Sequence, residues 1–186
     1  IYAQSVGGGG GVSGNNGYGI SFSGSVGAPG DAGDVTVVVD GNIRTAGPNT
    51  VGEDGTIDYT KGSHGVFAQS VAGDGRAGNV TISVTGNIIA EGQYSCGIVA
   101  QSQGLQGKGD ITINIAEGAS VSGGTGEHVG AIVLMDGNNN TVNNYGTIRS
   151  LNGIDGIAVL GNRTIATVNN WGVIIGNIEM NIEADT

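Results

Sequence analysis

A short repeated motif restricts the fold of this chain more than any other feature of its sequence. The motif reads IYAQSV, VFAQSV and IVAQS in its first three copies, and it degrades to AIVL and IAVL in two later copies. The five copies begin at Ile1, Val66, Ile98, Ala131 and Ile157. A segment this short cannot bury an apolar face alone, so the repeat predicts units that stack on one another and share a core.

A second motif lies between the copies of the first and consists of an alternating strand, a turn and a short second strand, as in DVTVVVDGNI. Its five copies begin at Asp34, Asn79, Asp110, Thr141 and Thr167. The two strands of each copy are separated by an even number of residues, so their apolar side chains are expected to face the same way. The predicted inward rows are Val37, Ile82, Ile113, Val142 and Val168, and then Ile43, Ile88, Val121, Ile148 and Ile174.

Three short strands per repeat of roughly 30 residues predict an all-β fold, a right-handed three-faced parallel β-helix of about five to six coils. We expect residues 1–186 to form a single segment of this solenoid, with Gly-rich loop excursions at about 7–33 and 46–64. Exposed loops often carry function, but tolerated insertions are the simpler interpretation of both excursions. Leucine-rich repeats lack their signature here, and β-propeller blades would need antiparallel hairpins. Collagen is excluded because Gly is abundant, at 39 residues, without an every-third-residue period.

Charge and composition narrow the range of partners. The net charge is −10, with 6 basic against 16 acidic residues, which disfavours nucleic acid and anionic membrane surfaces. The single cysteine, Cys96, cannot form an internal disulfide. No apolar run is long enough to span a bilayer, and the sequence does not open on a secretion signal. Because Ile1 lies inside a repeat motif, we expect the chain to be part of a longer protein.

Polar and aromatic side chains recur at equivalent positions of the repeats. Asn144 and Asn170 occupy the same inward frame in neighbouring coils and are predicted to form an asparagine ladder with amides bonded along the helix axis. Gln4, Gln69 and Gln101 form a similar row that faces outward or toward a turn. The aromatic residues at repeat-equivalent or turn positions are expected to stack between coils, although a glycan platform is an alternative. They are Tyr2, Phe67, Tyr145 and Trp171.

The residues that could carry chemistry do not form a recognisable catalytic pattern. The two histidines, His64 and His128, lie at repeat boundaries and not near a Gly-x-Ser-x-Gly nucleophile turn. Six basic residues in total do not suggest a cluster that would stabilise a uronate, and the acidic candidates fall in or beside loops. These acids are Asp31, Asp34, Glu53, Asp54 and Asp74. The segments around Asp31 and Asp74 faintly match calcium-binding nonapeptides but lack the nine-residue period. We therefore assign no catalytic, cofactor-binding or metal residues and expect no cofactor.

The recurring Ala-Gln-Ser motif, the Gly-rich run after its first copy and the Asn-Asn-Tyr/Trp-Gly-Thr/Val-Ile turns resemble the passenger regions of large bacterial autotransporters, which use type V secretion. The resemblance covers nearly the whole chain. It implies a surface-exposed β-helix that acts in adhesion, autoaggregation or biofilm formation. It also implies a bacterial cell-surface or extracellular location, with outer-membrane anchoring through a C-terminal barrel outside this chain.

These observations favour a non-enzymatic structural and adhesive segment whose partners are host or neighbouring-cell surface molecules or glycans. A self-assembling extracellular fibre or matrix protein is the alternative, because the ends of a β-helix expose unpaired strand edges that favour self-association. A β-helix polysaccharide lyase or hydrolase is a third possibility, which would require carboxylates converging on one groove.

Overall fold

The computed structural model describes residues 1–7, 30–47, 63–126 and 129–181, and they form three parallel sheets, here called A, B and C. Sheet A contains β1 (Tyr2–Val6), β4 (Val66–Ala72), β7 (Ile98–Gly104), β10 (Gly130–Asp136), β13 (Ile157–Asn162) and β16 (Asn177–Asn181). Sheet B contains β2 (Val35–Val39), β5 (Val80–Val84), β8 (Ile111–Ile115), β11 (Asn140–Asn144) and β14 (Ala166–Asn170). Sheet C contains β3 (Ile43–Thr45), β6 (Asn87–Ala90), β9 (Ser120–Gly123), β12 (Thr147–Ser150) and β15 (Val173–Ile175).

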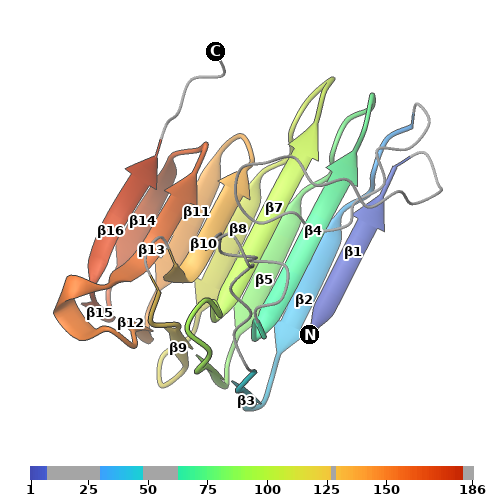
Figure 1. The fold of residues 1–186 in the computed structure, drawn as a ribbon. Coiled ribbons are helices and arrows are strands. Elements are labelled where there is room, and N and C mark those ends of the chain that lie inside the picture. The colour runs from blue at the N-terminus through green and yellow to red at the C-terminus, as the bar shows by residue number, and fades with distance from the viewer. Residues whose placement is uncertain (8–29, 48–62, 127–128, 182–186) are drawn as a thin grey trace, which may run out of the picture.

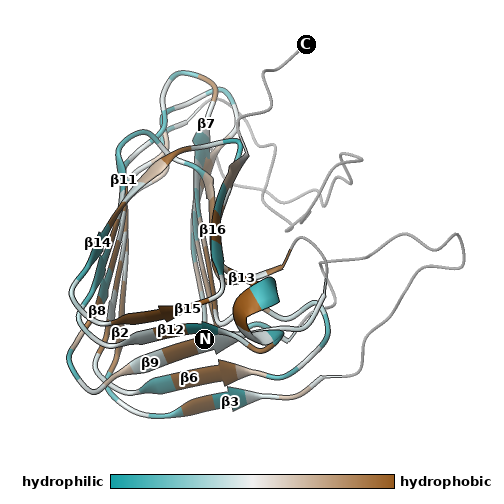
Figure 2. Ribbon diagram, turned by 90° about the vertical axis from the view of Figure 1, so that its left-hand side faces the viewer, coloured by the Kyte–Doolittle hydropathy of each residue, from teal (hydrophilic) through white to brown (hydrophobic). Residues whose placement is uncertain are grey.

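The chain visits the three sheets in turn, so that each coil contributes one strand to each sheet. Within every sheet, neighbouring strands come from consecutive coils, which gives the order from blue to red along the long axis in Figure 1. Figure 2 looks along that axis and shows the sheets as three sides of one prism. One turn of 3₁₀-helix, η2 (Gly153–Asp155), lies between β12 and β13. The predicted three-faced parallel β-helix is therefore confirmed, and β16 begins a sixth coil after five that carry all three strands.

The core between the sheets contains the two predicted rows of inward side chains. In sheet B, Val37 pairs with Ile82, and the register continues through Ile113 and Val142 to Val168. In sheet C the row runs from Ile43 through Ile88, Val121 and Ile148 to Ile174. The residues of the middle coils are fully buried. Each contributes roughly 1.5–3 kcal/mol of hydrophobic stabilisation, so the stacked rows supply the continuous core that a single coil lacks.

The register of sheet A differs from the predicted alignment in its two degenerate copies. The motif alignment placed Ala131 beside Ile98, whereas the structure pairs Ile132 with Ile98 and Leu134 with Ala100. The copy at Ile157 is displaced in the same way, because Ile157 pairs with Gly130. A shift of one residue moves a side chain to the opposite face of the sheet. The alternating pattern could not fix this register, because β10 is buried on both faces along its whole length.

The outer side of sheet A is covered as well. Phe67, Val99 and Val133 point away from the helix core, yet they are at most 3% exposed. They form a second apolar cluster with Cys96 and Val129, which come from the connections between sheet C and sheet A. Most of the two predicted Gly-rich excursions, including residues 8–29 and 48–62, lies outside the described residues.

Candidate functional site

The three glutamines of the first motif lie in one row on the outer side of sheet A, where β1, β4 and β7 pair in register. Gln4 Nε2 donates to Gln69 Oε1 at 2.6 Å, and Gln69 Nε2 donates to Gln101 Oε1 at 2.7 Å. Gln69 and Gln101 are buried, although they point away from the helix core. The predicted glutamine row is confirmed, and its amides bond to one another as stacked amides do in other parallel arrays.

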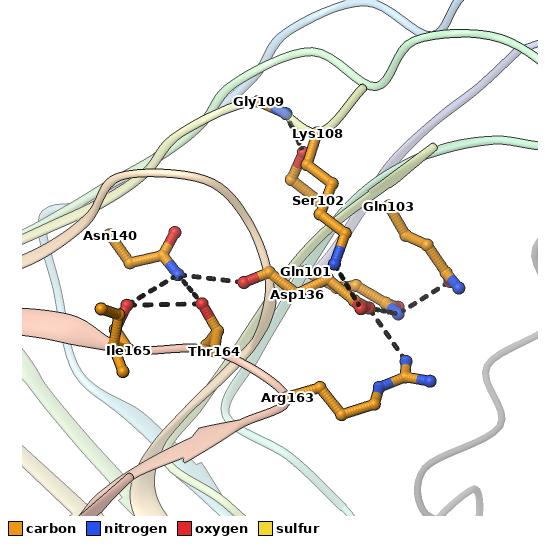
Figure 3. A network of polar contacts seen from close by, with 10 residues as sticks. All are labelled: Gln101, Ser102, Gln103, Lys108, Gly109, Asp136, Asn140, Arg163, Thr164 and Ile165. Carbon is orange, nitrogen blue, oxygen red and sulfur yellow. Dashed lines mark hydrogen bonds and ion pairs between the residues drawn. The ribbon is translucent and has the colours of Figure 1, made fainter. Parts of the chain in front are cut away.

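This row of amides ends on a buried carboxylate, Asp136 (Figure 3). Gln101 Nε2 donates to Asp136 Oδ2 at 3.0 Å. Lys108 Nζ lies 3.3 Å from Asp136 Oδ1, and Arg163 donates to Oδ2 at 3.0 Å. The side chain of Asp136 is 4% exposed, whereas those of Lys108 and Arg163 are 40% and 39% exposed. The carboxylate is therefore desolvated and fully engaged, while the two cations keep contact with water.

The end of β10 places this carboxylate. Asp136 pairs with Ser102 in the sheet, but its backbone has a φ of 58°, a left-handed conformation that few residues other than Gly, Asn and Asp adopt. Gly137 follows with a φ of 70°. Asn140 Nδ2 donates to the backbone oxygen of Asp136 at 3.0 Å and so holds the turn (Figure 3). This bend lets Asp136 reach Gln101, which lies beside Met135 in the register.

The network joins three consecutive coils. Lys108 follows β7, Asp136 ends β10 and Arg163 follows β13. One ion pair therefore joins the coil of Asp136 to the preceding coil, and the other joins it to the following coil. Sequence reasoning missed this cluster and expected no group of basic residues. Two of the six basic residues do converge here, but both already pair with Asp136. Because Asp136 accepts from three donors that belong to the coils before and after its own, it acts as an electrostatic clamp between coils.

Serine hydroxyls link the coils at the corner between sheets A and B. Ser70 Oγ donates to the backbone oxygen of Gly33 at 2.9 Å and accepts from the backbone N–H of Gly78 at 2.9 Å. Ser102 repeats this arrangement with Gly78 and Gly109. Each hydroxyl therefore bridges its own coil and the preceding one, which explains the recurrence of Ser after Gln in the motif.

The acidic candidates do not converge on one groove in the described part of the chain. Asp31 Oδ1 accepts the backbone N–H of Arg76 at 2.8 Å, and Asp34 Oδ1 accepts that of Asn79 at 2.7 Å. Asp74 is exposed in the turn after β4. Glu53 and Asp54 lie outside the described residues. Asp31 and Asp34 thus bond backbone groups of the next coil.

Two asparagine rows run along the helix. Asn144 Nδ2 donates to Asn170 Oδ1 at 2.7 Å, which confirms the predicted ladder, and Asn144 is fully buried. The sequence analysis missed a second row on the outer side of sheet B. There Asn143 Nδ2 donates to Asn114 Oδ1 at 2.9 Å, and Asn169 Nδ2 donates to Asn143 Oδ1 at 2.9 Å. The recurrence of Thr-x-Asn in the last three copies of the second motif was the signal for it.

His64 and Cys96 lie next to each other, just before β4 and β7. His64 Nδ1 accepts the backbone N–H of Cys96 at 2.9 Å, while His128 lies outside the described residues. Complete burial raises the pKa of the Cys96 thiol to about 12. The thiol therefore stays protonated and unreactive at neutral pH.

Aromatic rings stack between neighbouring coils, as predicted. The ring centroids of Tyr2 and Phe67 are 4.8 Å apart, and those of Tyr145 and Trp171 are 4.6 Å apart with an interplanar angle of 7°. Stacked rings turn their faces toward each other along the helix axis. The Tyr145–Trp171 contact therefore covers one face of each ring that a sugar would need for stacking.

Among the described residues, no group of three or more His, Cys, Asp or Glu side chains is placed to hold a metal ion. No helix in that same part of the chain is long and apolar enough to cross a membrane. Comparison with known proteins gives no significant match: no family model fits the chain, and no curated protein or solved structure is significantly similar to it.

Proposed function

We propose that this chain is a non-enzymatic structural and adhesive segment of a bacterial cell-surface protein. The observation that carries the proposal is the use of polar side chains to join coils. Gln69, Ser70, Asp34 and Asn144 each bond to a group in the adjacent coil. Side chains held in this way stabilise the axial continuity of a rod and are not available for catalysis.

The repeat motifs give the proposal its biological setting. Their resemblance to autotransporter passengers favours a location outside the cell, attached to the outer membrane by a part of the protein beyond this chain. The protein would then present the β-helix to host or neighbouring-cell surface molecules or glycans. The net charge of −10 favours uncharged or cationic partners over nucleic acid.

Surface display tests this function directly. The chain is fused to a heterologous outer-membrane anchor in a non-adherent bacterium, and the anchor alone serves as the control. Autoaggregation is followed by settling of the culture, and adhesion by retention on epithelial cells and matrix-coated surfaces. We expect display to increase at least one of these. Full display without any increase, together with cleavage of polysaccharides by the purified chain, would show that the protein is an enzyme.

A further inference from the structure

The outer face of sheet B carries a row of threonines that runs the length of the described helix. The strands of sheet B pair in register, so one Thr from each coil lies beside the next. The row consists of Thr36, Thr81, Thr112, Thr141 and Thr167. All five are partly or fully exposed, in contrast to the buried residues on either side of them in β5, β8 and β11.

The hydroxyls of this row have no partner among the residues that the structure describes. None of the five side-chain hydroxyls makes a hydrogen bond in the described part of the chain, whereas the corner hydroxyls of Ser70 and Ser102 are fully engaged. A β-branched side chain has few accessible rotamers, and each Thr therefore presents its hydroxyl and methyl groups in a restricted orientation. The row therefore offers a line of hydroxyl and methyl groups to the solvent.

A second outward row lies two residues further along each strand. Its members are Val38, Ser83, Asn114, Asn143 and Asn169. The three asparagines hold one another through the two 2.9 Å amide bonds described above, which fixes the positions of their side chains. Each primary amide has two N–H groups and two acceptor lone pairs, so this row also keeps hydrogen-bonding capacity toward solvent.

No charged side chain belongs to either row, although the chain has a net charge of −10. Carboxylates lie at the ends of the strands, and each bonds a group of the next coil: Asp34 accepts from the backbone of Asn79, Asp110 from that of Asn139, and Asp40, which follows β2, from the hydroxyl of Thr85. The face is also regular. In Figure 2, β2, β8, β11 and β14 lie one behind another with little twist. Side-chain ladders of this kind stabilise flat sheets.

The two rows form a two-dimensional lattice. Neighbouring strands are spaced at about 4.8 Å, and alternate residues of one strand at about 6.6 Å. We propose that this Thr and Asn face of sheet B binds ice. Its uncharged groups repeat in two directions with periods similar to those of oxygen rows on ice surfaces, and its hydroxyls and amides supply donors and acceptors to ordered water while the Thr methyls exclude other water.

Other occupants fit this face less well. Protein interfaces are anchored by buried aromatic or Arg side chains, and the two rows contain neither. Nucleic acid needs cations that the rows lack. A crystalline polysaccharide would stack its sugar rings on open aromatic faces, and no aromatic residue lies in either row.

The purified full chain tests the proposal by thermal hysteresis and by the shape of single ice crystals. Thr141→Lys places a charged, flexible side chain in the middle of the row. Thr147→Lys is the matched control, because Thr147 is a partly exposed Thr on sheet C. Urea midpoints of both variants establish that the helix stays folded.

We expect hysteresis and faceted crystals from the unmodified chain and from Thr147→Lys, and loss of both effects in folded Thr141→Lys. Crystals that grow without a hysteresis gap in the presence of the unmodified chain would overturn the proposal, as would full activity in Thr141→Lys. Sedimentation with crystalline cellulose or chitin in the absence of ice activity would assign the face to a polysaccharide instead. The settling assay above is independent of ice, so the failure of either proposal leaves the other intact.

Discussion

Replacement of Asp136 by Asn isolates the electrostatic part of the clamp at the end of the glutamine row. The amide has nearly the same shape and still offers an acceptor to Gln101. It removes the charge that Lys108 and Arg163 approach at 3.3 and 3.0 Å, and it places an N–H₂ group against donors. Each ion pair to a half-exposed cation is worth at most about 1 kcal/mol, and a buried donor left without an acceptor costs about 1 kcal/mol more. We therefore expect Asp136→Asn to lower the free energy of unfolding by about 2–3 kcal/mol.

Equilibrium unfolding in urea, followed by far-ultraviolet circular dichroism, measures this loss. Asp110→Asn is the matched control. Asp110 accepts the backbone N–H of Asn139, and Asn79 performs the same role one coil earlier by accepting from Asp110. The control should change stability by less than about 0.5 kcal/mol. Equal, small losses in the two variants would refute the argument that the Asp136 ion pairs hold the coils together.

Three further predictions concern the core, the turns and the thiol. Ile113→Ala should destabilise the chain by about 3–4 kcal/mol in urea unfolding, because Ile113 is fully buried in the continuous core, and a loss below 1 kcal/mol would contradict that core. Gly86→Ala should lower the free energy of unfolding by about 3 kcal/mol, because the added Cβ would lie 2.0 Å from the backbone oxygen of Gly41. Gly41→Ala is the control and should change stability little, because its Cβ meets nothing within 4 Å; equal urea midpoints for the two variants would refute the close stacking of these turns. Cys96 should not react with a thiol reagent at pH 8 until urea is added. Because burial raises its pKa from the ordinary 9.0 to about 12, its contribution to stability should be complete below pH 9 and lost as the pH rises toward 12, a slope absent from Cys96→Ala.

The strands of sheet B were predictable because one constraint, the burial of a single face, sets both their alternating sequence and their pairing register. In β5, buried Val80, Ile82 and Val84 alternate with partly exposed residues, and every neighbouring strand of sheet B has the same phase. Only one register keeps the apolar side chains inside. The Asn144–Asn170 ladder followed from that register and needed no further information.

Sheet A was less predictable because both of its faces are buried. In β10 every position is buried, so apolarity does not distinguish the inner from the outer face, and the motif alignment was displaced by one residue. The Asp136 network escaped sequence reasoning for a related reason. Its members lie far apart in the chain, and among the described residues of the earlier coils no residue other than Gly has the left-handed φ that brings the carboxylate of Asp136 to Gln101.

The sequence by itself determined the number of faces, the stacking of coils and the inward rows of sheets B and C, because short-range alternation and a long-range repeat both constrain them. The tertiary structure alone decided the register of β10, the burial of the outer side of sheet A and the meeting of Lys108 and Arg163 on one carboxylate. These features depend on contacts between side chains of different coils. Such contacts are set by packing and by turn geometry, which a one-dimensional pattern of apolar and polar residues does not encode.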